Sequence, residues 1–324
     1  MPQTLAQRAS HLQRVAFGFF PTPLERLRNV ATAIPGARAD VLVKRDDLTG
    51  FSTAGNKLRL LEFLLGDALA QDAQVMVGCG PTTSNFIASL SQTSAACGLG
   101  VEVYIPGPIT PNPSIALAEA AGASVTSVPL TRHEIDAYVA GRAAELTSSG
   151  IRAYGTPRGG ATPIGAVGYA LAVEETVGQL GGRDDVVFVV PAGSCATSAG
   201  ILAGLTLLDS PHRVIAVSTN RQIDEARDVL LTISAGVVDL LGGAADRPEK
   251  RLTLIDRADG ETDEDLGHVR NVLRQSGVIA AEHYGPATLT EVVRAAQEPA
   301  ASTVVWWHTG GTLGLPRLLD LVAE

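Results

Sequence analysis

Short runs of β-branched and other apolar residues alternate along the chain with longer stretches in which apolar residues recur every three or four positions. The short runs predict buried strands and the longer stretches predict helices, an order typical of βαβ units in a mainly parallel sheet. The predicted strands are 41–44, 74–77, 101–105, 123–128, 186–190, 214–218 and 303–307. The predicted helices are 56–71, 85–98, 113–121, 133–148, 163–180, 197–208, 262–275, 285–297 and 312–323.

Two glycine-rich junctions, near 49–55 and at 157–163, interrupt this alternation. They predict an α/β fold of two lobes, each an open, mainly parallel twisted sheet flanked by helices. Residues 51–160 would form a smaller inserted lobe, and residues 1–50 together with 161–324 would form the larger lobe. Because ligands of such sheets bind beyond the carboxyl ends of the strands, we expect a ligand in the cleft between the lobes.

The composition argues against several classes of protein. A net charge of −9, with no run of Lys or Arg, disfavours a nucleic-acid or anionic-membrane surface. The three cysteines lack metal-ligand spacing and fit a reducing compartment. No stretch reaches the roughly 18 apolar residues of a membrane span, and no signal peptide is visible. These features predict a soluble, cytoplasmic protein without a metal site.

Lysine is scarce, with Lys44, Lys57 and Lys250 against 22 arginines. A primary amine can form an imine with an aldehyde, whereas a guanidinium cannot. Lys57 follows Gly55-Asn56 at the start of a predicted helix, where the field of the helix lowers the pKa of an amine. The alternative is a surface lysine in a first helical turn. Lys44 is predicted to belong to a structural charge cluster and Lys250 to be solvated.

Three more turns follow predicted strands and precede a helix or the chain end. Hydroxyls and one amide crowd the turn 78–85, which suits a carboxylate or a cofactor oxygen, or else caps the helix. The turn 191–200 combines successive backbone N–H groups with hydroxyls, which is typical of a cup for one phosphate. A tight packing turn is the alternative there. At 306–312, Thr309 could face a ring nitrogen, while His308 alone more often indicates a structural histidine.

Together these features describe one ligand, pyridoxal 5′-phosphate, an aromatic aldehyde with a single phosphate. The chain also resembles the pyridoxal-phosphate enzymes of the tryptophan synthase β-like fold (fold type II). The resemblance is to the branch of D-cysteine desulfhydrase and 1-aminocyclopropane-1-carboxylate deaminase. It covers nearly the whole chain, through motifs at Pro21–Leu24, Val43–Leu48, Gly55–Arg59, Thr83–Asn85, Gly159–Ala166, 193–200 and His308–Gly311.

The resemblance implies roles for individual residues. Lys57 would form the Schiff base with the cofactor, Ser84 would lie close to the substrate, and Tyr284 would assist as an acid or base. Asn85 would hold the phenolic oxygen of the cofactor, and Thr309 would lie near the pyridine nitrogen. The remaining predicted cofactor-binding residues are Asn56 and the phosphate cup Gly193, Ser194, Cys195, Ala196 and Thr197.

The resemblance further implies a homodimeric, pyridoxal-phosphate-dependent lyase or deaminase that catalyses β-elimination on a small amino acid. A thiol or sulfonate would leave, giving a keto acid and ammonia. Gly285 and Thr309 occupy positions where ring-opening deaminases carry Glu and Leu, which disfavours ring opening. A β-replacement transferase and a non-catalytic cofactor-binding relic are the alternatives. Arg158 would either bind a second anion on the substrate or be a solvated loop arginine.

Overall fold

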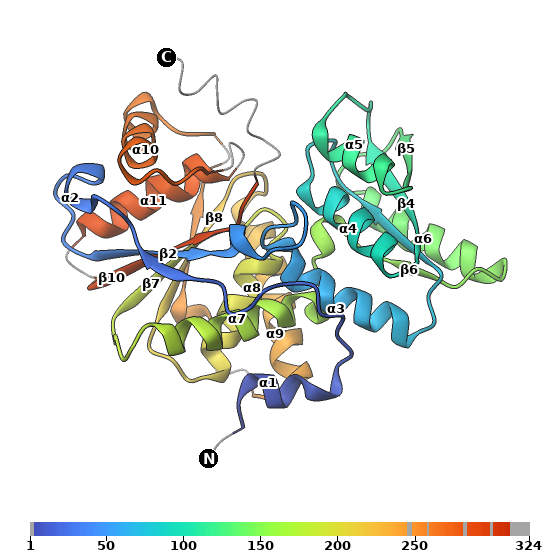
Figure 1. Cartoon of the computed structure of the whole chain (residues 1–324), viewed down its shortest axis with the longest axis horizontal. Coiled ribbons are helices and arrows are strands. Elements are labelled where there is room, and N and C mark those ends of the chain that lie inside the picture. Colours follow the sequence, from blue (N-terminus) through green and yellow to red (C-terminus); the bar gives the residue numbers. More distant parts are fainter. Residues whose placement is uncertain (1–2, 245–247, 258, 281–283, 299–300, 312–324) are drawn as a thin grey trace.

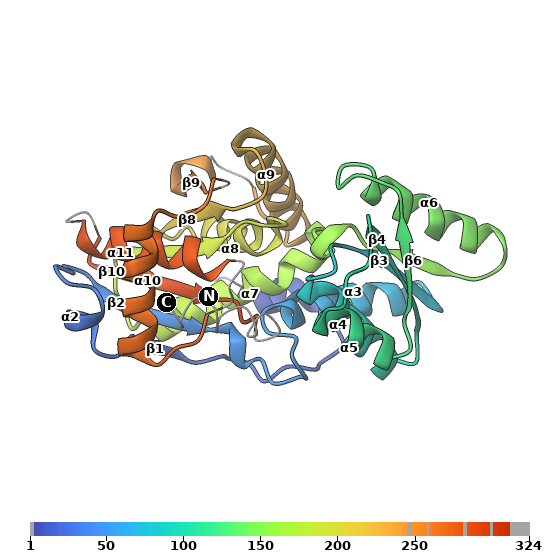
Figure 2. The ribbon, with the colours of Figure 1, turned by 90° about the horizontal axis from the view of Figure 1, so that it is seen from above.

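A computed structural model of the chain describes residues 3–244, 248–257, 259–280, 284–298 and 301–311. Two separate sheets form the frame, and helices pack around both (Figures 1 and 2). All strand pairs are parallel except the pair of β1 with β2, which is antiparallel. The helix predicted over 312–323 lies outside the described residues.

The larger sheet has six strands in the order β1-β2-β10-β7-β8-β9. Its strands are β1 Leu24–Arg26, β2 Asp40–Arg45, β7 Val186–Pro191, β8 Arg213–Ser218, β9 Leu252–Asp256 and β10 Thr303–His308. The central strand β10 is buried along its whole length, which explains its nearly continuous apolar sequence. Segments that are more than 250 positions apart in the sequence lie side by side here, because the six residues of β10 pair with the six residues of β2.

The smaller sheet has four strands in the order β5-β4-β3-β6. Its strands are β3 Val75–Cys79, β4 Gly100–Pro106, β5 Ser124–Val128 and β6 Ala153–Gly155, and its helices are α4 Asn85–Ala96, α5 Pro113–Ala120 and α6 Ile135–Ser148. The helix α3, Lys57–Ala70, packs against both α4 and α7 (Figure 1). Lobe boundaries at residues 50 and 160 stay a prediction.

Helices cover both faces of the larger sheet (Figure 1). One face carries α2 Val30–Ala33, α10 Asp263–Ser276 and α11 Gly285–Gln297, and the other carries α1 Leu5–Arg8, α7 Pro163–Gln179, α8 Ala196–Leu207 and α9 Ile223–Leu240. Short 3-10 turns are η1 Ala9–His11, η2 Asp46–Leu48, η3 Arg158–Gly160 and η4 Pro248–Arg251. Gly200 lets α8 approach α7 closely, since a Cβ at Gly200 would lie 2.3 Å from the Ala166 carbonyl oxygen. This contact sets the position of the α8 N-terminus.

Each of the seven predicted strands is present, with ends shifted by at most two residues or so, and the structure adds elements that the prediction lacked. The added strands β1, β6 and β9 are short or lie at sheet edges, where pairing depends on a distant partner. The pattern of strands and helices predicted above also lacks the long helix α9. The 3.6-residue spacing of Ala226, Leu230, Ile233 and Val237 on its buried face would have indicated it.

Candidate active site

Lys57 is the first residue of α3, and the turn before it is packed against the turn that follows β10. Gly55 has φ +53°, and a Cβ there would lie 2.8 Å from the Thr309 carbonyl oxygen. The backbone N–H of Asn56 donates to the same oxygen at 3.1 Å. Glycine at position 55 is therefore required both for the left-handed backbone and for this close approach.

Asn56 connects the Lys57 turn to α8. Its side-chain amide donates to the Thr197 hydroxyl at 3.1 Å, and its own carbonyl accepts from the buried Tyr169 hydroxyl at 3.0 Å. Asn56 is itself buried. Three segments that are far apart in the sequence thus meet at Lys57: the Gly55–Lys57 turn, the first turn of α8 and the turn at Thr309.

The Lys57 amine has no charge partner among the described residues, in which no ion pair or hydrogen bond to its Nζ is found. Burial lowers the pKa of Lys57 to about 8, and no nearby charge contributes to the shift. By contrast, the Lys44 ammonium is buried and donates to Glu175 at 2.6 Å, besides the Thr22 carbonyl at 2.8 Å. Lys250 is exposed on η4. The structure thus confirms Lys44 as a structural cation and Lys250 as a solvated one.

The predicted phosphate cup is the N-terminus of α8. Cys195 precedes the helix with φ +71°, and its thiol lies 3.6 Å from the Ala192 carbonyl oxygen, away from the helical N–H groups. No side chain in the described parts of the chain caps this first turn. Gly159 allows the 157–163 segment to reach the cup, since a Cβ there would lie 2.7 Å from Ser194. Open N–H groups at a helix N-terminus suit a phosphate dianion.

Ser84 and Asn85 lie at the start of α4, a second helix that begins without a side-chain cap among the described residues. Both are half-buried. The first turns of α3 and α4 approach each other around Gly160, where a Cβ would lie 2.6 Å from Leu60 and 2.8 Å from Phe86. The N-terminus of α4, like that of α8, presents backbone N–H groups without a side-chain cap and so suits an anion.

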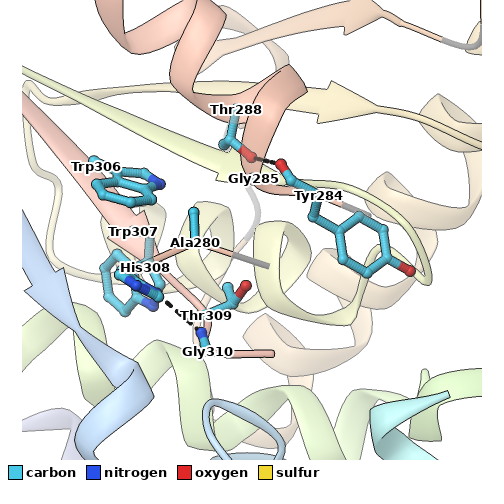
Figure 3. A pocket seen from close by; sticks show the side chains of 9 residues that line it. All are labelled: Ala280, Tyr284, Gly285, Thr288, Trp306, Trp307, His308, Thr309 and Gly310. Carbon is cyan, nitrogen blue, oxygen red and sulfur yellow. Dashed lines mark hydrogen bonds between the residues drawn. The ribbon is translucent and has the colours of Figure 1, made fainter. Parts of the chain in front are cut away.

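A small cavity lies beside Thr309 at the end of β10 (Figure 3). His308 lines it, but both ring nitrogens are engaged: Nε2 lies 2.6 Å from the Ile279 carbonyl oxygen, and Nδ1 accepts from Gly310 N–H at 3.1 Å. Burial lowers the pKa of His308, so the ring is neutral. It stacks on Trp306, with centroids 4.7 Å apart. His308 is therefore structural, and it orients the Thr309 turn.

Tyr284 lines the same cavity with its backbone, while its ring points away from the other lining side chains (Figure 3). The ring covers Gly193, where a Cβ would lie 2.7 Å from the phenolic oxygen. Burial raises the pKa of Tyr284, and a hydrogen bond from the Asn220 side chain opposes that shift. Next to it, the Ala280 methyl occupies the space beside Gly285, since a Cβ at Gly285 would lie 2.7 Å from that methyl.

Arg158 is not a solvated loop arginine. Its guanidinium forms an ion pair with Asp136 at 2.9 Å, and its backbone N–H donates to the same carboxylate at 2.8 Å. Only 16% of the Arg158 side chain is exposed, so this pairing is held within the protein.

Sequence reasoning placed Lys44 in a structural charge cluster but missed that Arg59 of α3 joins it, forming a buried charge network under α3. Arg59 is 3% exposed and bonds to Asp46 at 2.8 Å and to Glu175 at 2.7 Å, while Trp307 donates to Asp46 at 2.8 Å. The network holds the first turn of α3, two residues beyond Lys57. The signal in the sequence was a charged residue inside an otherwise apolar helical run, Leu58–Leu61.

Comparison with known proteins agrees with this geometry. The family model for pyridoxal-phosphate dependent enzymes matches residues 15–310. A putative 1-aminocyclopropane-1-carboxylate deaminase of Pyrococcus horikoshii is 32% identical over 90% of each chain. The nocardicin C-9′ epimerase of Nocardia uniformis is 33% identical, covering 84% of this chain and 86% of that protein. The D-cysteine desulfhydrase of Yersinia pestis is 27% identical, covering 96% and 98%.

Solved structures give the same picture of the fold. The crystal structure of an ACC deaminase homologue has a TM-score of 0.88 at 30% identity and covers 99% of this chain and 100% of that chain. The structure of O-ureido-L-serine synthase, at 18% identity, shares the fold with a TM-score of 0.65. In the described part of the chain, no helix is long and apolar enough to cross a membrane. The same residues contain no cluster of three or more His, Cys, Asp or Glu side chains suited to a metal ion.

Proposed function

Since this chain belongs to the family of pyridoxal-phosphate dependent enzymes, we propose that it is a lyase acting on a small amino acid by β-elimination. A thiol or sulfonate leaves the β-carbon, and with one water the products are a keto acid, ammonia and the protonated leaving group. The observation that carries this proposal is the Lys57 amine, which has no partner among the described residues, has a lowered pKa and lies where three turns meet.

The residues at this place fit the cofactor. The open N–H groups of the first turn of α8 would hold its phosphate, Lys57 would bind its aldehyde carbon, and Asn85 and Thr309 would contact its ring. When bound, the cofactor withdraws electrons from the α-carbon of the substrate. The Asn56–Thr197 hydrogen bond keeps the lysine and the phosphate cup at a constant separation.

Two side chains would handle the protons. An amine with a pKa of about 8 is a suitable base near neutral pH, so Lys57 would remove the α-proton. Tyr284 would act as the acid, because its raised pKa keeps the phenol protonated until the leaving group departs. The uncapped N-terminus of α4, with the Ser84 hydroxyl, would bind the substrate carboxylate.

The packing at Gly285 favours elimination over ring opening. The family resemblance implies a glutamate at this position in ring-opening deaminases. Here the Ala280 methyl lies 2.7 Å from the place of a Cβ, so a longer side chain at position 285 has no room unless residue 280 moves. The carboxylate that ring opening would use is therefore absent, whereas Lys57 and Tyr284, which elimination needs, are both present.

The test is release of keto acid and sulfide from D- and L-cysteine by the cofactor-loaded protein, with sulfite release from cysteate measured in parallel. We expect turnover of one enantiomer, its loss in Lys57→Ala and a fall of about a hundredfold in Tyr284→Phe. Tyr138→Phe is the matched control, because Tyr138 is 38% exposed on α6. Exchange of the α-proton with solvent in the absence of any keto acid would refute elimination.

A further inference from the structure

Three arginines converge beside the phosphate cup from different parts of the chain. Arg132 lies between β5 and α6, Arg158 lies in η3, and Arg221 follows β8. Burial lowers the pKa of Arg132, and the positive charges of Arg158 and Arg221 lower it further. The cluster thus joins the side of the smaller sheet to the larger sheet and concentrates positive charge there.

Carboxylates neutralise two of these arginines but not the third. Arg158 pairs with Asp136 at 2.9 Å, and Arg221 pairs with Glu225. Arg132 donates one N–H to the Asn220 carbonyl, and its Nε is buried without a hydrogen-bond partner in the described chain. Three positive charges therefore face two negative ones, and the excess charge resides on the arginine with an unused donor. The Arg132 side chain is half-buried, but its Nε has no access to water, and an unpaired buried donor costs free energy unless a ligand pairs with it.

The cluster lies next to both the phosphate cup and the proposed acid, Tyr284. Arg221 Nε donates to the Gly193 carbonyl at 3.1 Å. The Tyr284 ring covers the same glycine. Burial raises the pKa of Tyr284, and the positive charges of Arg221 and Arg132 oppose that rise, so both arginines lie near the phenol. Two further buried oxygens here, Thr219 Oγ1 and Asn220 Oδ1, lack partners among the described residues. The unused polar atoms thus gather where the leaving group of a substrate would meet Tyr284.

We propose that Arg132, supported by Arg158 and Arg221, binds a second anionic group at the end of the substrate side chain. The preferred substrates would then be amino acids whose side chain ends in a sulfonate or carboxylate. This inference rests on the proposed function in taking an amino acid as the ligand and Tyr284 as the acid near its leaving group. A planar guanidinium with an open Nε suits such a group, because it can donate two parallel hydrogen bonds to it.

The experiment compares the binding of isosteric acidic and neutral amino acids to the cofactor-loaded protein. Aspartate and asparagine, each as D- and L-forms, are titrated while the visible absorbance of the bound cofactor is followed. We expect the holoprotein to bind one enantiomer of aspartate at least about tenfold more tightly than the matching asparagine. Arg132→Gln should remove this preference for aspartate over asparagine. Arg132→Lys should keep part of the preference, because the positive charge remains.

Arg152→Gln is the matched control, because Arg152 also donates to a backbone carbonyl, that of Asp72, but is exposed. The Arg152→Gln variant should keep the full preference for aspartate over asparagine. Equal binding of aspartate and asparagine by the unmodified protein would overturn the proposal without any variant. Equal loss of both ligands in Arg132→Gln, together with weaker cofactor retention, would overturn it too and assign the arginine to the phosphate. Keto-acid release is measured separately. Binding therefore tests the role of Arg132, and keto-acid release tests the proposed elimination, so that either can fail without the other.

Discussion

The lowered pKa of Lys57 makes the capture of pyridoxal phosphate by the cofactor-free protein depend on pH in a defined way. Only a neutral amine attacks an aldehyde. Burial, with no nearby carboxylate to oppose it, lowers the pKa of Lys57 from 10.5 to about 8. Protonation should therefore limit the capture rate below about pH 8 and stop limiting it above that value.

The size of the effect follows from the two pKa values. At pH 7 an amine with a pKa of about 8 is about 9% neutral, whereas an ordinary lysine is about 0.03% neutral. The population of reactive amine differs by a factor of about 300. The capture rate should rise about tenfold between pH 6 and 7 and level off above about pH 8, instead of rising until pH 10.5.

The assay measures the rate of cofactor binding by stopped-flow absorbance from pH 6 to 10, with Nα-acetyl-lysine as the reference amine. The ratio of the protein rate to the reference rate should be constant below about pH 8 and fall about tenfold per pH unit above it, because only the neutral fraction of the reference amine still rises. The division cancels the ionisations of the cofactor itself. Lys57→Ala, which retains Lys44 and Lys250, measures capture by other amines. A protein rate that keeps rising to pH 10, in parallel with the reference amine, would show that the amine is not desolvated and would refute the reasoning.

Two further predictions concern the frame of the site. Asp46→Asn leaves Arg59 buried without its main partner and should lower the free energy of unfolding by about 3–5 kcal/mol. Asp40→Asn removes a carboxylate from a partly exposed ion pair and should lower the free energy of unfolding by about 1 kcal/mol or less. Similar urea midpoints for the two variants would contradict the argument. Gly55→Ala should weaken cofactor retention and lower the melting temperature more than Gly36→Ala does. Both positions have positive φ, but only at Gly55 would the methyl meet a carbonyl, so equal effects would count against the close packing.

The sequence alone was enough to predict those elements of the structure that depend on residues close together in the chain. Strand and helix periodicity identified the seven strands that carry the two sheets, and turn composition identified the starts of α3, α4 and α8. Lys57 was singled out because few lysines exist and one of them begins a helix after Gly-Asn. These signals are local, since backbone turns and helix starts depend on residues within a few positions.

The tertiary structure decided which distant side chains pair. Asn56 bonds to Thr197, 141 positions away, and so joins the lysine to the phosphate cup. Arg158 pairs with Asp136, and Arg221 with Glu225, so within the described residues Arg132 is the member of this cluster without an ion pair to a carboxylate. No local pattern distinguishes these arginines, because a side chain's partner depends on which strands and helices pack together. The chemistry of Lys57 could thus be predicted from its neighbours, and its surroundings only from the fold.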